Sequence, residues 1–204
     1  AFEMAEQVEK LVKVYKNTKV DAQMLKDADV DAVILAIGSS PITIKLEGMD
    51  KLQHASAPEV LRHEVCPKGK VAVIGGGLVG LETADTLATD GCDVTVLEMK
   101  DEIGSDLGSL RKIAVMMKLQ QMQVKMLPNS KVCKFTEEGI VLEDETLVPC
   151  NCAVFAVGFA SNDSHLLVEE CEKRQIPCRV IGDAKSARRA LDAIAEGFEA
   201  ARTL

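Results

Sequence analysis

The fold is decided by the stretch Lys70-Val-Ala-Val-Ile-Gly-Gly-Gly-Leu-Val-Gly-Leu-Glu-Thr-Ala84. It opens with a continuous apolar run, which is typical of a parallel strand buried on both faces. Apolar residues at helical spacing continue to Asp90, and a second short strand is expected over residues 93–98. Strand, glycine turn, helix and strand within about 30 residues form a βαβ unit, whose crossover is right-handed in nearly all proteins. The sequence therefore predicts the α/β class, with helices packed on a parallel sheet.

Three glycines stand at fixed places in the turn and satisfy the pattern G-x-G-x-x-G. Gly75 allows a tight turn off the strand, Gly77 lets backbone approach a pyrophosphate, and Gly80 lets helix and strand pack closely. The following helix presents unpaired N–H groups and its positive dipole end to phosphates. Because a strand precedes the motif and a helix follows it, we predict a dinucleotide site. Its turn residues are Gly75, Gly76, Gly77, Leu78, Val79 and Gly80.

An acidic residue ends the second strand, near the distance of about 20 residues expected for the acid that binds the adenosine ribose. This residue is Glu98, and a carboxylate there repels a 2′-phosphate, which favours NADH over NADPH. Lys100 would offset part of that repulsion. In isolation, Glu98 would be interpreted as an ordinary surface acid at a strand end.

Two further positions are candidates for cofactor contacts. Glu82 lies near the mouth of the predicted site and would touch the nicotinamide side, or would simply be solvated. Gly158 follows a buried strand at its carboxyl end, where open α/β sheets bind ligands, although a plain turn is the alternative.

One apolar pattern occurs twice, as Asp31-Ala-Val-Ile-Leu-Ala-Ile-Gly38 and as Asn151-Cys-Ala-Val-Phe-Ala-Val-Gly158. The two copies are expected to be corresponding strands of two related domains. The second copy follows its own βαβ unit and a small antiparallel meander predicted over residues 131–148. Only a helix (1–11) and a short strand (within 12–20) precede the first copy, so we expect the first domain to be truncated at its beginning.

Composition narrows the class of protein. The 204 residues are 47% apolar and carry a net charge of −8, which predicts a globular protein that nucleic acid would not bind. No apolar run approaches the about 20 residues of a membrane span and no signal peptide opens the chain, so a cytoplasmic location is expected. The seven cysteines lack a disulfide or zinc spacing and are expected to be mostly buried thiols, although Cys150 and Cys152 leave a redox or metal pair open. The three histidines are expected at the surface.

Four segments together resemble a known family. They are Gly75-Gly-Gly-Leu-Val-Gly-Leu-Glu-Thr-Ala84, Glu98-Met-Lys-Asp-Glu-Ile103, Ala36-Ile-Gly-Ser-Ser-Pro41 and Val180-Ile-Gly-Asp183. In this order they resemble the flavoproteins with two dinucleotide-binding domains. The greatest likeness is to the C-terminal half of NADH:flavin oxidoreductases of the enoate reductase and 2,4-dienoyl-CoA reductase type. The resemblance covers nearly the whole chain.

The resemblance implies a division of the chain by cofactor. Residues 65–158 would form a Rossmann domain for NAD(P)H, with Gly75, Gly77, Gly80 and Glu98 as ligands. Residues 1–64 and 159–204 would form parts of a truncated FAD-binding-type domain. Gly182 and Asp183 would meet the FAD ribityl or pyrophosphate, and Gly38 would end a strand of the flavin domain. For Asp183, a cap before the helix expected over residues 187–202 is the alternative.

The resemblance also implies a role. The family's first glycine motif, its iron–sulfur cysteines and its FMN-containing N-terminal barrel have no counterpart in this sequence. The chain would therefore be the electron-input portion of a flavin oxidoreductase that passes hydride from NADH to a flavin, inactive alone, and no catalytic residue or metal ligand is assigned to it. Its partners would be NADH, the flavin and the missing barrel, and an enoate or enoyl thioester would be the final acceptor. The alternative is a non-catalytic NADH-binding or structural module.

Overall fold

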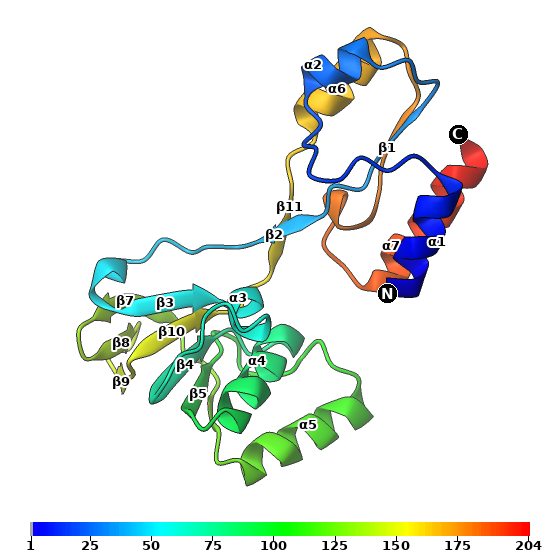
Figure 1. Ribbon diagram of the computed structural model, residues 1–204. Coiled ribbons are helices and arrows are strands. Elements are labelled where there is room, and N and C mark those ends of the chain that lie inside the picture. Colours follow the sequence, from blue (N-terminus) through cyan, green and yellow to red (C-terminus); the bar gives the residue numbers. More distant parts are fainter. Residues whose placement is uncertain (1) are drawn as a thin grey trace. The chain divides into compact units, whose positions relative to one another are not determined.

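The computed structural model describes residues 2–204, with residues 2–5 described by their backbone alone. The chain forms two compact units (Figure 1). The split unit consists of Ala1–Ser39 together with Ser161–Leu204, and the inserted unit is Ser40–Ala160. The predicted domains change instead at residues 64/65 and 158/159. The predicted limits describe which segments bind NADH and which bind FAD, and this division remains a prediction.

The inserted unit is built on a five-stranded sheet in the order β3-β10-β4-β5-β6, in which every pairing is parallel. Its strands are β3 (Gln53–Ser56), β4 (Lys70–Ile74), β5 (Asp93–Leu97), β6 (Lys125–Leu127) and β10 (Cys152–Phe155). Its helices are α3 (Ala57–Leu61), α4 (Leu78–Thr89) and α5 (Ser109–Gln121), with a 3-10 turn η1 (Met49–Lys51). The α/β class predicted from the sequence is confirmed.

Successive residues of β4 pack in two different core clusters, because the sheet is covered on both faces. Val71 and Val73 pack with Leu81 of α4 in one core cluster. Ala72 packs with Phe135 in a second cluster, on the opposite face of the sheet. Because successive side chains of a strand point to opposite faces, a run without polar residues is required here. Burial of each such Val or Leu side chain contributes about 1.5–3 kcal/mol.

The second face is covered by the predicted meander of β7 (Val132–Thr136), β8 (Gly139–Leu142) and β9 (Leu147–Pro149), which pair antiparallel. The rings of Phe135 and Phe155 stack with centroids 5.9 Å apart. His54 is exposed, and its ring meets the edges of both phenylalanines. This histidine therefore supports an aromatic cluster between meander and sheet.

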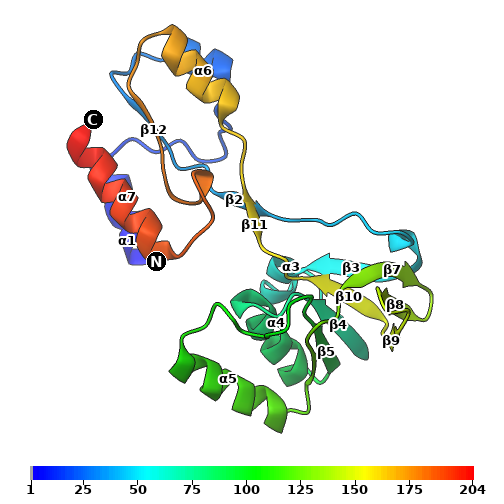
Figure 2. The ribbon, with the colours of Figure 1, turned by 180° about the vertical axis from the view of Figure 1, so that it is seen from behind.

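The split unit contains a two-stranded parallel sheet of β1 (Val33–Leu35) and β12 (Cys178–Val180). Its helices are α1 (Phe2–Leu11), α2 (Ala22–Asp27), α6 (His165–Lys173) and α7 (Ala190–Thr203), with a 3-10 turn η2 (Gly182–Ala184). Helices α2 and α6 lie side by side in both ribbon views (Figure 2). Arg174 joins them by donating hydrogen bonds to the carbonyls of Leu25 and Ala28.

The repeated apolar segments become β1 and β10, one in each unit. Each leads to a glycine with a left-handed backbone, Gly38 at φ +73° and Gly158 at φ +104°. Each glycine is followed by a short strand, β2 (Ser39–Pro41) or β11 (Phe159–Ser161), and these two strands pair with each other. The chain thus leaves and re-enters the split unit through one strand pair.

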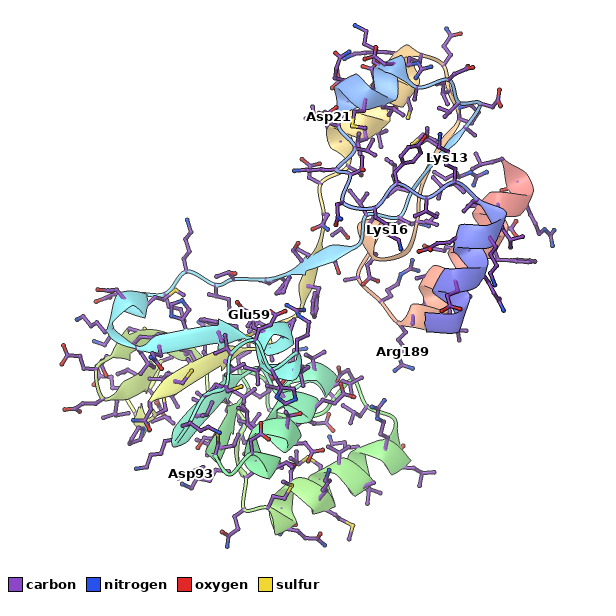
Figure 3. All side chains as sticks on the ribbon, viewed as in Figure 1. Lys13, Lys16, Asp21, Glu59, Asp93 and Arg189 are labelled. Atoms are coloured by element: carbon purple, nitrogen blue, oxygen red, sulfur yellow. The ribbon has the colours of Figure 1, made fainter. Side chains whose placement is uncertain are left out.

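Some local predictions were wrong. No strand forms within residues 12–20, where Asn17 takes φ +54° and interrupts any extended run. Helix α2 was not predicted, although Asp21 caps it by accepting a hydrogen bond from Met24 N at 2.8 Å (Figure 3). Strand β3 and helix α6 were also not predicted. The helix expected over residues 1–11 is α1, and Ala1 lies outside the described residues.

No helix among the described residues is long and apolar enough to cross a membrane.

Candidate functional site

The glycine turn between β4 and α4 leaves no space for side chains. A Cβ on Gly75 would lie 2.4 Å from the carbonyl oxygen of Ala156, and the residue takes φ +110°. A Cβ on Gly80 would lie 1.9 Å from the carbonyl oxygen of Gly75. Gly75 is therefore required by its positive φ and by the chain that follows β10, and Gly80 by the close approach of helix α4 to the end of β4.

Glu98 is held against this turn. Its Oε2 accepts a hydrogen bond from Gly76 N at 2.7 Å, and its Oε1 accepts one from Lys100 N at 2.9 Å. Each carboxylate oxygen has a further lone pair, so the half-buried side chain can still accept hydroxyl donors. The backbone thus fixes one negative charge beside the turn.

Asp106, which lies between β5 and α5, contacts the first turn of α4. Its Oδ1 and Oδ2 lie 3.1 and 3.0 Å from Leu78 N, which donates to this carboxylate. The N-cap residue of the helix, Gly77, has no side chain of its own to offer. Asp106 was not predicted from the sequence, because its contact joins residues from different elements that no spacing rule connects.

A cavity of about 520 Å³ opens beside the turn, within the inserted unit. This volume lies in the range of about 300–1,000 Å³ that is usual for small-molecule sites. The predicted residues that line it are Gly75, Gly77, Leu78, Val79, Glu98 and Gly158. Apolar side chains such as Ile44 and Val132 form part of the wall, and Lys100, Asp106 and Lys131 supply charges.

Three other predicted residues do not line this cavity. Gly76 and Gly80 are buried in the turn itself. Glu82 is exposed on α4, and its Oε1 accepts a hydrogen bond from Arg111 of α5 at 2.8 Å. Its contact with a nicotinamide remains a prediction.

The remaining predicted residues meet in the split unit. A cavity of about 350 Å³ is lined by residues that include Gly38, Gly182 and Asp183. Asp183 accepts hydrogen bonds from Ser39 Oγ and from Arg188 N, both at 3.2 Å. The bond to Arg188 N ties Asp183 to the segment before α7, but the N-cap residue of this helix is Arg189, so Asp183 does not cap it.

Glu196 of α7 supports the same cavity. Its Oε2 accepts a hydrogen bond from Gly182 N at 2.7 Å, and its other oxygen accepts one from Arg188. The Arg188 guanidinium and the Gly182 N–H lower the pKa of Glu196 to about 2. Backbone at Gly182 is therefore fixed by a carboxylate that stays ionised at neutral pH.

The cysteines are all free thiols. Burial raises the pKa of Cys150 and of Cys152 to about 11, so both remain protonated at neutral pH. A protonated thiol is a poor nucleophile and a poor metal ligand, which argues against a reactive pair at this position. Among the described residues, no group of three or more His, Cys, Asp or Glu side chains is placed to hold a metal ion.

Comparison with protein families gives a match to "Pyridine nucleotide-disulphide oxidoreductase" over residues 2–184. The chain is 36% identical over 191 residues to a bilirubin reductase of Mediterraneibacter gnavus, covering 90% of this chain and 29% of that protein. It is 34% identical over 201 residues to a cinnamate reductase of Clostridium sporogenes, covering 95% of this chain and 29% of that protein. The chain therefore spans less than a third of the length of these relatives.

Among solved structures, the chain resembles a 2-naphthoyl-CoA reductase in complex with 2-naphthoyl-CoA. The TM-score is 0.85 at 24% identity, and the match covers 98% of this chain and 31% of that one. At this identity the likeness concerns the fold. It includes both units of the chain.

Proposed function

Because the chain belongs to the pyridine nucleotide-disulphide oxidoreductase family, we propose that it binds NADH at the glycine turn and serves as the electron-input portion of a flavin-dependent reductase. The family implies a nicotinamide cofactor together with FAD. NADH, when bound, supplies a hydride, and the flavin accepts it; the protein contributes binding and orientation.

One observation carries the proposal. Glu98 and the glycine turn face the same cavity, and the Gly76 N–H holds the Glu98 carboxylate in place. A dinucleotide needs both a carboxylate for its ribose hydroxyls and bare backbone for its pyrophosphate. Gly77 and Leu78 provide that backbone at the start of α4, where the helix dipole favours an anion.

The charges around the cavity favour NADH over NADPH. A 2′-phosphate would approach the fixed Glu98 carboxylate, which repels it. Lys100 and Lys131 also line the cavity, but Lys131 is paired with Glu143 at 2.7 Å. Part of the positive charge that would attract a third phosphate is thereby neutralised.

The apolar part of the cavity wall excludes water. Ile44, Val132 of β7 and Leu97 at the end of β5 remove water from one side of the cavity. A nicotinamide ring bound there would be shielded on that side. Gly158, at the carboxyl end of β10, would approach the cofactor through its backbone.

The FAD would be held in part by the split unit. Gly38 takes a left-handed conformation with no atom within 4 Å of a hypothetical Cβ, so its backbone is accessible to a ligand. Gly182 and Asp183 line the same 350 Å³ cavity, and Glu196 fixes the Gly182 N–H. These features suit a ribityl or pyrophosphate contact.

The final acceptor is inferred from the substrates named for two of the reported proteins. Cinnamate is an enoate, and 2-naphthoyl-CoA is an aromatic acyl thioester. We therefore infer an enoate or enoyl thioester as the substrate of the complete enzyme. An N-terminal barrel with FMN, and an iron–sulfur cluster, would relay the electrons to it.

The test is a titration of the purified chain with NADH and NADPH, following reduced-nicotinamide fluorescence, which no tryptophan disturbs. We expect NADPH to bind at least about tenfold more weakly, which corresponds to about 1.4 kcal/mol. Glu98→Gln should remove most of that preference. The matched control is Glu102→Gln, which removes the same charge from an exposed side chain on the same segment.

If neither NADH nor NADPH binds to a demonstrably folded chain, the proposal is refuted. The alternative, a non-catalytic NADH-binding module, would be favoured if the complete protein bound NADH and FAD without reducing the flavin.

A further inference from the structure

The start of α4 already holds an anion. Both carboxylate oxygens of Asp106 lie within hydrogen-bond distance of Leu78 N, at 3.1 and 3.0 Å. Asp106 Oδ2 also lies 3.2 Å from the position that a Cβ on Gly77 would occupy. The carboxylate thus covers the bare backbone at which a pyrophosphate would be bound.

A carboxylate and a pyrophosphate cannot both use this position. Each carries negative charge, each is attracted by the positive end of the helix, and the single Leu78 N–H can satisfy one acceptor well. Their mutual repulsion is strong at such short range. One of the two anions must therefore leave when the other binds.

The segment that carries Asp106 is buried at Ile103 and Gly104 but exposed at Asp106 and Gly108. Gly104 N donates to Gly76 O at 2.8 Å, and Ile103 is buried against the turn. Asp106 itself is exposed, and Gly108 has open space around a hypothetical Cβ. The side chain can therefore move outward without disturbing the buried anchor.

We propose that Asp106 is an internal competitor of the dinucleotide: its carboxylate caps α4 in the ligand-free chain and leaves Leu78 N when the pyrophosphate binds. This regulation rests on the proposed function, because it concerns the same cavity. The Asp106 carboxylate lowers the affinity for NADH and stabilises the ligand-free chain. Its substitution should therefore raise the affinity and lower the stability. A residue that only supports the fold would not change the two in opposite directions.

The experiment compares Asp106→Asn with the unmodified chain. Calorimetry measures the dissociation constant of ADP-ribose, which contains the pyrophosphate without the nicotinamide, and fluorescence measures that of NADH. Thermal unfolding without ligand gives the second readout. We expect the variant to bind both ligands about two- to fivefold more tightly, in line with the usual strength of a charge at a helix end, and to unfold at a lower temperature.

Asp101→Asn is the matched control, because it removes the same charge from an exposed position on the same segment. It should leave both readouts nearly unchanged. Asp106→Ser, with a shorter side chain, repeats the test if Asp106→Asn folds poorly.

Three outcomes would overturn the inference. Unchanged or weaker binding of ADP-ribose to the Asp106 variants, with normal NADH binding by the unmodified chain, contradicts the competition alone. Equal tightening by Asp101→Asn would assign the effect to net charge and also contradicts it. If no variant and no unmodified chain binds either ligand, the proposed function fails together with the competition.

Discussion

Substitution of Gly80 by alanine tests whether the glycine turn is built as described. The added Cβ would lie 1.9 Å from Gly75 O and 3.4 Å from Ala156 Cβ. Gly80 is buried in the first turn of α4, and the atom it meets belongs to backbone that the adjoining strand holds. The turn and the helix must therefore separate for the methyl group to fit.

The cost can be worked from this contact. A distance of 1.9 Å is more than about 1.5 Å short of an optimal carbon contact, and the clash is with backbone. Overpacking of this kind costs about 3 kcal/mol, of which the better helix propensity of alanine returns about 1 kcal/mol. We expect Gly80→Ala to lower the free energy of unfolding by about 2 kcal/mol and Tm by about 4–8 °C.

Thermal and urea unfolding followed by circular dichroism measure this change, and a titration with NADH follows its effect on the site. We expect NADH binding to weaken as well, because Gly75 must move with the helix. The control is Gly108→Ala, where nothing lies within 4 Å of the Cβ position and φ is −65°. Gly108 is the N-cap residue of α5, where alanine is poorer than glycine, so this change should cost no more than about 1 kcal/mol, half of the effect expected at Gly80. A Gly80→Ala chain with unchanged Tm and NADH affinity would show that the turn and the helix are not packed this closely.

Two further predictions concern titratable groups. The pKa of Glu196 falls from its ordinary value of 4.5 to about 2, so its ionised form stabilises the fold above pH 4.5, and this contribution is lost as the pH falls towards 2. Glu196→Gln should therefore unfold more easily than the unmodified chain at pH 7, and the difference, measured by urea unfolding, should disappear near pH 2; a constant difference would contradict the assignment. Iodoacetamide at pH 7.5 should alkylate the exposed Cys66 and Cys133 while sparing Cys150 and Cys152, whose pKa is about 11. Peptide mass spectrometry measures the order in which the cysteines are alkylated, and early labelling of Cys152 would show that this thiol is not buried.

The βαβ unit was predictable because local signals agree there. Its strands are continuous apolar runs, and its glycines are demanded by contacts of 1.9 and 2.4 Å that any other residue would block. Strand β3 gave no such signal, since only Ala55 among its residues is buried and its conformation depends on pairing with β10. Helix α2 is short, and its capping by Asp21 was the sole strong local cue.

The candidate site also contains residues that local sequence signals predict and residues that only the tertiary structure brings together. Glu98 was found because it follows a strand at the usual distance from the glycines. Asp106 was missed because its contact with Leu78 depends on how the segment after β5 folds back onto the turn. The fixing of Gly182 by Glu196 likewise joins residues from different elements, and only the tertiary structure brings them together.

A dinucleotide bound at the glycine turn of the inserted unit would be detected by titrating the isotope-labelled chain with NADH and following backbone amide resonances by nuclear magnetic resonance. We expect the largest shifts at Gly76, Gly77 and Leu78 and at the Lys100 N–H that holds Glu98. Saturable shifts confined to other parts of the chain, with these amides unchanged, would contradict binding at the glycine turn.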